Sequence, residues 1–182
     1  MAVKFDKINK EHIKFIENQK MFVIGSAGAD GFINVSPKGM DTFKVIDENT
    51  VVWLNYTGSG NETSTHVQEN GRMTVMFNSF DKAPLILKLY GKATVIHQKD
   101  ERWDEMLAHF EPQVGTRQFF EMKVELVLTS CGYAVPEYTF VKERDTLKKW
   151  SNKKGQEGIE AYWEENNVLS LDGVETNVLK FS

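Results

Sequence analysis

The sequence has a single cysteine, Cys131, and no long hydrophobic run. One cysteine excludes an intrachain disulfide, which favours a reducing compartment, and we interpret Cys131 as a small buried residue at a strand end. No apolar stretch approaches the length of about 20 residues that a membrane-spanning helix needs. Residues 1–12, MAVKFDKINKEH, lack the apolar core of a signal peptide. We therefore expect a cytoplasmic protein with no membrane partner.

Positive charge is also scarce, since the formal net charge is −4 and the pI is near 5.6. This balance argues against nucleic acid as a partner, because phosphate backbones are bound by basic surfaces. The four histidines are scattered, and none has another metal ligand at a suitable spacing. We therefore expect no metal site. His66 is better explained by packing or solvent exposure than by catalysis.

The order of short apolar segments predicts a mainly β fold. Strands are expected at 21–26, 32–35, 43–46, 50–54, 72–77, 85–96 and 119–129, with Gly91 as a bend or bulge. In the last strand, Phe120, Met122, Val124, Leu126 and Leu128 alternate onto one face. Helices are expected at 9–20 and 100–110. Closely spaced strands joined by tight turns favour an antiparallel barrel or sandwich over a doubly wound α/β sheet.

The C-terminal part of the chain has a helical pattern instead. Leu147, Trp150, Ile159 and Tyr162 are its apolar positions, and glycines at 155 and 158 should divide it into two pieces. We therefore expect a barrel domain over residues 1–140 and a helical extension over residues 141–182 that packs on it.

The most informative stretch is 51–77, VVWLNYTGSGNETSTHVQENGRMTVMF. An apolar strand leads through a glycine turn to Asn61, a strong N-cap residue, and then to a short polar helix. Ser59, Asn61 and Thr63 gather hydroxyl, amide and free backbone N–H groups at one helix N-terminus, which can bind a phosphate. An ordinary capped helix explains the same residues equally well.

A second segment, Ser36-Pro37-Lys38-Gly39, ends a predicted strand with a hydroxyl, a rigid bend and a cation. Pro37 requires that the strand finish there or lie at a sheet edge. Lys38 is a plausible partner for an anionic ligand, and an exposed turn lysine is the competing explanation. Two anion-binding segments in an acidic protein favour the ligand interpretation.

These segments resemble one known family. The stretches INVSPKG, WLNYTGSGNETSTHVQENGRMTVMF, LILKLYGKATVI, TSCGYAVPEYTFVKERDTLKKW and SLDG occur in the order seen in pyridoxamine 5′-phosphate oxidase-like proteins. They are most similar to the bacterial branch with SPKG and GSGNET-H motifs. The resemblance extends from about residue 22 to residue 173.

The resemblance implies an antiparallel FMN-binding split β-barrel that works as a homodimer, with the flavin at the subunit interface. Residues 33–38 would run beneath the isoalloxazine, 53–55 would line it, and 59–64 would meet the ribityl phosphate. The flavin contacts we then expect are Ser36, Lys38, Trp53, Leu54, Asn55, Ser59, Asn61 and Thr63.

The chain also departs from the true oxidase. Ile33, Thr63 and Ser64 stand where that enzyme has an arginine and an Arg-Lys pair. The phosphate charge would then be met by Lys38, Arg72 or Lys88, by neutral donors or by the partner chain. Oxidation of pyridoxamine 5′-phosphate itself is therefore not expected.

The leading hypothesis is an FMN-dependent oxidoreductase acting on a small molecule, with NAD(P)H as a candidate electron donor. The flavin would carry out the redox chemistry, so the absence of a recognisable catalytic triad does not count against an enzyme. One alternative is a non-enzymatic flavin- or haem-binding, stress-related dimer. Another is an empty barrel that serves as an interaction module.

Overall fold

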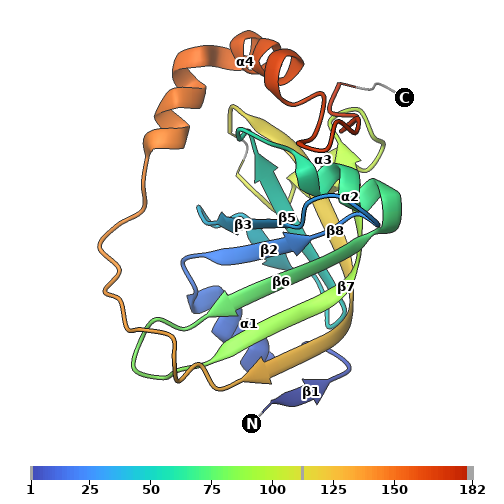
Figure 1. Cartoon of the computed structure of the whole chain (residues 1–182). Coiled ribbons are helices and arrows are strands. Elements are labelled where there is room, and N and C mark those ends of the chain that lie inside the picture. The colour runs from blue at the N-terminus through green and yellow to red at the C-terminus, as the bar shows by residue number, and fades with distance from the viewer. Residues whose placement is uncertain (1, 112, 180–182) are drawn as a thin grey trace.

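The computed structural model describes residues 2–111 and 113–179. Most of these residues form one curled antiparallel sheet, with helices at its ends and over one edge (Figure 1). In chain order the elements are β1 (Val3–Phe5), α1 (Lys10–Asn18), β2 (Phe22–Ser26), β3 (Asn34–Lys38), β4 (Phe43–Val45), β5 (Thr50–Tyr56), α2 (Glu62–Asn70), β6 (Arg72–Asn78), β7 (Ile86–His97), α3 (Trp103–Leu107), β8 (Thr116–Ser130) and α4 (Thr146–Asn166).

The sheet has the strand order β3-β2-β6-β7-β8-β5-β4, and β1 pairs with the outer part of β8. Every pairing is antiparallel. The expected antiparallel barrel is thus confirmed, in the form of an open, curled sheet. The strands β3 and β4 are its two edges, and they are joined by a short connection after Lys38.

Aromatic side chains fill the concave side of this sheet. Phe22, Phe43 and Phe77 contact one another with ring centroids 5.1–5.7 Å apart. The ring of Trp53 stacks on Phe120 at 4.7 Å. Aromatic pairs of this kind contribute about 0.5–1.5 kcal/mol beyond their buried area. All five of these aromatic residues therefore belong to one buried core cluster.

A β-bulge changes the predicted face pattern of β8. Opposite Tyr90 and Gly91 of β7 the register shifts, because Tyr90 pairs with Leu126 whereas Gly91 pairs with Val124. A Cβ on Gly91 would lie 1.9 Å from the carbonyl oxygen of Lys123, so the close approach requires glycine. Beyond this point the alternation inverts. Val127 is buried and Leu126 only half-buried, so the predicted placement of Leu126 and Leu128 on the buried face is wrong.

Two other element boundaries also differ from prediction. Only Trp103–Leu107 of the expected helix 100–110 is α-helical. The strand β3 continues through Pro37 to Lys38, which is possible because β3 is an edge strand. The predicted break at Gly155 is confirmed, since this residue has φ 67° and ψ 175° inside α4.

The C-terminal part of the chain leaves the end of β8, runs outside the sheet and reaches α4 beyond the opposite end (Figure 1). After α4 it returns to the start of α2, where the carbonyl of Thr176 accepts hydrogen bonds from Ser64 (2.8 Å) and Gln68 (2.9 Å). The indole N–H of Trp163 donates to Thr57 at 2.8 Å. These contacts attach the extension to α2 and to the loop that follows β5.

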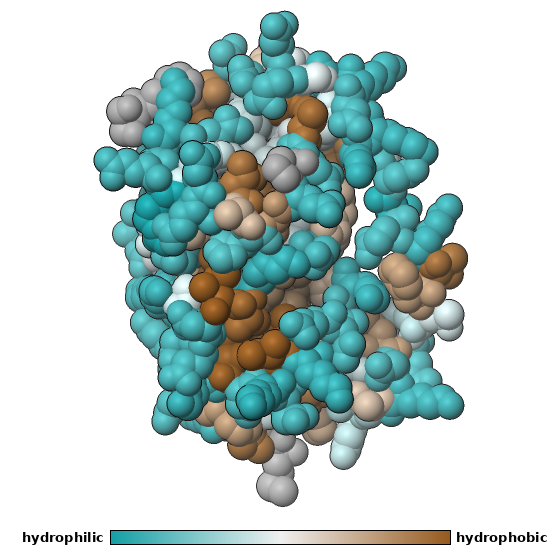
Figure 2. Space-filling view, turned by 180° about the vertical axis from the view of Figure 1, so that it is seen from behind, coloured by the Kyte–Doolittle hydropathy of each residue, from teal (hydrophilic) through white to brown (hydrophobic). Residues whose placement is uncertain are grey.

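Hydrophobic side chains also occur at the surface. Figure 2 shows a group of them in the middle of the face opposite to that of Figure 1, surrounded by hydrophilic side chains. In the part of the chain that the structure describes, no helix is both long and apolar enough to cross a membrane.

Candidate functional site

The alternation of β3 places its polar side chains on one face. Asn34, Ser36 and Lys38 are partly buried, whereas Val35 and Pro37 point outward and are exposed. The hydroxyl of Ser36 donates to Oδ1 of Asn34 at 3.0 Å. The strand thus presents an amide, a hydroxyl and an ammonium group in one row.

The start of α2 faces this row. Asn61 occupies the N-cap position, as predicted, but its side chain does not cap the helix. Its Nδ2 instead donates to Oε1 of the fully buried Gln118 at 3.1 Å. The expected capping interaction is therefore wrong, because the buried amide of Gln118 offers Asn61 a competing partner. The first N–H groups of α2, which have no partner within a helix, are left without this cap.

A chain of hydrogen bonds joins α2 to β3. Nδ2 of Asn34 donates to Oγ1 of Thr63 at 3.0 Å, and Oγ of Ser26 donates to the same oxygen at 3.3 Å. Ser26 is also 3.0 Å from Nδ1 of His66, which is buried. His66 is thus buried within this network and not exposed to solvent, and the hydroxyl of Thr63 links the two segments.

Between the two segments lies a crevice with a volume of about 540 Å³. This size falls in the range of small-molecule sites, about 300–1,000 Å³. It is lined by Phe32, Ile33, Asn34, Ser36, Pro37, Lys38, Gly58, Ser59, Gly60, Glu62, Arg117 and Leu171. The structure therefore brings Ser36, Lys38 and Ser59 together, with Asn61 and Thr63 directly behind the wall.

Arg117 is a cation of this crevice that the sequence reasoning missed. It is only 3% exposed, and its Nη1 donates to Oδ1 of Asn167 at 2.7 Å. Its Nε has no hydrogen-bond partner among the described residues. Burial lowers the pKa of Arg117 to about 10, so the guanidinium stays charged at neutral pH. A charged residue two positions before Phe119, where the apolar run of β8 begins, was the available signal.

Lys38 is the second cation. Its Nζ lies 5.1 Å from the centre of the Trp53 ring. Burial, together with the positive charge of Arg117, lowers the pKa of Lys38 to about 8. A buried guanidinium and a partly buried ammonium group, whose pKa the guanidinium lowers, are suited to an anion that would neutralise them.

The remaining predicted residues lie elsewhere. Trp53, Leu54 and Asn55 are buried in β5, and none of them lines the crevice within the described chain. Trp53 reaches the crevice only through the ammonium group of Lys38 that lies over its ring. That these three residues contact a flavin stays a prediction. For such contacts to form in this crevice, the backbone of β5 would have to be exposed there or the strand would have to move.

Other sequence-based candidates do not join the site. Arg72 on β6 and Lys88 on β7 do not line the crevice as far as the structure describes the chain. Cys131 is exposed, so its interpretation as a buried residue is wrong, because β8 ends at Ser130 and the chain there leaves the sheet. No cluster of three or more potential metal ligands occurs among residues 2–111 and 113–179.

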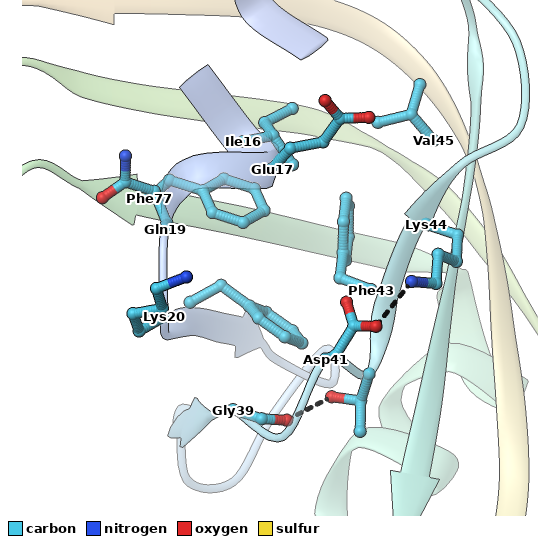
Figure 3. Close-up of a pocket in the computed structure, with 12 residues that line it drawn as sticks. Ile16, Glu17, Gln19, Lys20, Gly39, Asp41, Phe43, Lys44, Val45 and Phe77 are labelled. Atoms are coloured by element: carbon cyan, nitrogen blue, oxygen red, sulfur yellow. Dashed lines mark hydrogen bonds and ion pairs between the residues drawn. The ribbon is translucent and has the colours of Figure 1, made fainter. Parts of the chain in front are cut away.

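A smaller cavity, of about 170 Å³, lies beside the connection between β3 and β4 (Figure 3). The ring of Phe43 lies in its wall, and Lys20 and Lys44 are among its polar side chains. Lys44 is paired with Asp41 at 2.8 Å, and Glu17 adds a second negative charge. A cavity of about 150 Å³ holds one benzene ring. Both its size and its balanced charge make it less suitable for an anionic tricyclic ligand than the crevice.

Comparison with known proteins gives a family match over most of the chain. Residues 8–131 match the family model described as pyridoxamine 5′-phosphate oxidase. The pyridoxamine 5′-phosphate oxidase family protein ustO of Aspergillus flavus is 36% identical over 141 residues, which are 75% of this chain. The chain spans 57% of the length of that relative.

Solved structures share the fold at low sequence identity. The proposed pyridoxamine 5′-phosphate oxidase of Lactobacillus delbrueckii has a TM-score of 0.55 and 18% identity, over 69% of this chain and 97% of that one. For HupZ of Group A Streptococcus the TM-score is 0.52 at 19% identity, over 65% and 91%. For the haem storage protein HutZ of Vibrio cholerae it is 0.50 at 18%, over 70% and 98%. The predicted split barrel is thereby confirmed as the fold.

Proposed function

This chain belongs to the pyridoxamine 5′-phosphate oxidase family, and from that premise we propose that it is an FMN-binding oxidoreductase. The proposal rests on one observation. The crevice joins Lys38, Arg117 and the uncapped N-terminus of α2, three features that each favour an anion.

The donors in the crevice fit the phosphate of FMN. The guanidinium of Arg117 has an unpartnered Nε, and Lys38 supplies a second positive charge to the lining of the crevice. Ser59 and the first N–H groups of α2 add neutral donors. When bound, FMN would supply hydride or electron transfer, while these side chains would hold and orient it.

The substrate proposed is a small molecule other than pyridoxamine 5′-phosphate. The positions at which the resemblance expects basic residues hold Ile33, Thr63 and Ser64. Thr63 and Ser64 are buried and engaged in hydrogen bonds to Asn34 and Thr176, so their side chains already have partners. In this chain the guanidinium for the phosphate would instead come from Arg117, which lies on β8.

Flavin is favoured over haem. Haem iron is usually bound by histidine, cysteine, methionine or tyrosine. None of these types occurs among the described residues that line the crevice, although the haem storage protein HutZ shares the fold. The crevice offers cations to an anionic group and no axial ligand to an iron.

A second copy of the chain is the partner we propose. Phe32, Ile33 and Leu171 line the crevice and are 65%, 76% and 71% exposed. Exposed apolar side chains of this size beside a ligand site are typical of an interface. A homodimer would cover them and would complete the wall of the crevice.

FMN and riboflavin titrations test the proposal, because the two ligands differ only in the phosphate. The wild type should bind FMN more tightly than riboflavin. Arg117→Met should weaken FMN binding by about tenfold to a hundredfold, as for a lost charge-assisted hydrogen bond, and leave riboflavin binding unchanged. Arg72→Met, outside the crevice, is the matched control. Equal affinities of the wild type for both ligands, or no binding of either, would contradict the proposal.

Turnover is tested separately from binding. The FMN-loaded protein should be reduced by NADH or NADPH and reoxidised by an added acceptor, as followed by the loss and return of flavin absorbance. Tight FMN binding with no reduction by either nucleotide would contradict the oxidoreductase and indicate a flavin carrier.

A further inference from the structure

Glu62 is the one acidic side chain among the described residues that line the crevice. It is the first residue of α2, so its negative charge lies at the positive end of the helix. The same place in the crevice is the one that the phosphate of FMN would take under the proposed function. Under the proposed function, the carboxylate of Glu62 and the phosphate would therefore compete for one position.

The carboxylate of Glu62 folds back against Gly60. A Cβ on Gly60 would lie 2.5 Å from Oε2 and 2.7 Å from Oε1 of Glu62, closer than real Cβ contacts. The glycine thus leaves the room that this carboxylate occupies. Within the described residues, the carboxylate forms neither a hydrogen bond nor an ion pair, so nothing in the chain fixes it there.

Glu62 also acts on the two cations through its charge. It raises the pKa of Lys38 and that of Arg117, against the effect of burial. A bound phosphate would act on both groups in the same direction. The free protein therefore carries a weak substitute for the ligand charge at the place where the ligand would bind.

We propose that Glu62 competes with the phosphate of FMN, and that its carboxylate must move out of the crevice when FMN binds. This inference rests on the proposed function and adds a specificity-determining residue to it. The competition lowers the affinity for the phosphate in particular and makes FMN an exchangeable ligand. Binding of the flavin ring without its phosphate, as in riboflavin, should be unaffected.

Glu62→Gln tests the inference, because it removes the charge and keeps the size of the side chain. The variant should bind FMN about tenfold more tightly than the wild type, as expected when one repulsive charge at close range is removed. Its affinity for riboflavin should stay the same, and the free protein should melt slightly earlier because the helix has lost its internal anion. Glu62→Asp keeps the charge and should stay close to the wild type. Glu69→Gln, at the far end of α2, is the matched control.

The outcomes separate this inference from the proposed function. Unchanged or weaker FMN binding by Glu62→Gln, or an equal gain for riboflavin, would overturn the role of Glu62 while FMN binding by the wild type stands. Absence of FMN binding by the wild type would instead overturn the proposed function. In that case inorganic phosphate is the probe, and a phosphate affinity that Glu62→Gln leaves unchanged overturns the competition as well.

Discussion

Replacing Lys38 with methionine should stabilise the free protein and weaken FMN binding at the same time. Burial and the charge of Arg117 hold the pKa of Lys38 at about 8, below its ordinary 10.5. The folded state therefore disfavours the ammonium form that the side chain keeps at neutral pH. Methionine removes the charge and retains an apolar side chain over the ring of Trp53.

The difference between the two pKa values corresponds to about 3 kcal/mol at pH 7. The lost contact of the ammonium with the Trp53 ring offsets about 0.5–1 kcal/mol of this. We therefore expect the free energy of unfolding to rise by about 2 kcal/mol. FMN affinity should fall by about tenfold or more, because a charged donor to the phosphate is removed.

The sign of the pH dependence follows from the lowered pKa of Lys38. Below about pH 8 the lysine is charged in both states, and the folded wild type carries the full penalty. Between about 8 and 10.5 the folded state loses its proton first, so wild-type stability rises with pH. Above that range the lysine is neutral in both states. The advantage of Lys38→Met should therefore shrink between pH 8 and 10.5.

Urea unfolding at pH 7 and pH 10, followed by tryptophan fluorescence, measures both effects. Lys88→Met, on β7 and not among the residues that line the crevice, is the control for the loss of a lysine charge elsewhere in the sheet. A variant at position 38 that is less stable than the wild type at pH 7 would refute the reasoning. So would an advantage of the same size at both pH values, because titration of Lys38 would then not be its cause.

Three further outcomes are expected. FMN affinity of the wild type should fall above about pH 8, by up to about tenfold per pH unit, as Lys38 loses its proton; a flat profile to pH 10 in fluorescence titrations would count against this residue as a phosphate ligand. Asn61→Ala should cost about 1–3 kcal/mol in urea unfolding, because Oε1 of the buried Gln118 loses its donor; a cost near zero would be evidence against that contact. Gly91→Ala should cost about 3 kcal/mol or more, because its Cβ would collide with the carbonyl of Lys123; a normal thermal melt would disprove the bulge.

The sequence predicted most strands because their apolar alternation and their turns are local properties. The face of Leu126 was not predictable in this way. It depends on the register shift opposite Tyr90 and Gly91 of β7, where β8 has one extra residue, Glu125, between Val124 and Leu126. The sequence pattern of β8 shows which residues face the core in the first part of the strand. Only the pairing with β7 shows where the buried face changes to the other set of residues.

The candidate site was predicted in part for a similar reason. Lys38 and Ser59 could be predicted because each belongs to a local motif, at the end of β3 and in the glycine turn after β5. The structure brings the two motifs together in one crevice. Arg117 was missed because a charged residue at a strand start normally points to solvent. Its burial depends on Asn167, 50 residues away in sequence. Asn61 was placed correctly, and its bond to Gln118 depends on a strand that comes later in the chain.

The position of Asn167 has a consequence for how such chains diverge. Its one side chain accepts from Arg117 through Oδ1 and donates through Nδ2 to the carbonyl of Gly58 at 3.1 Å, so it holds the guanidinium and the glycine turn of the crevice together. A relative that ends before this residue would retain the whole sheet and lose the orientation of its guanidinium. Ligand preference can therefore change through the length of the tail alone, with every residue of the barrel left as it was.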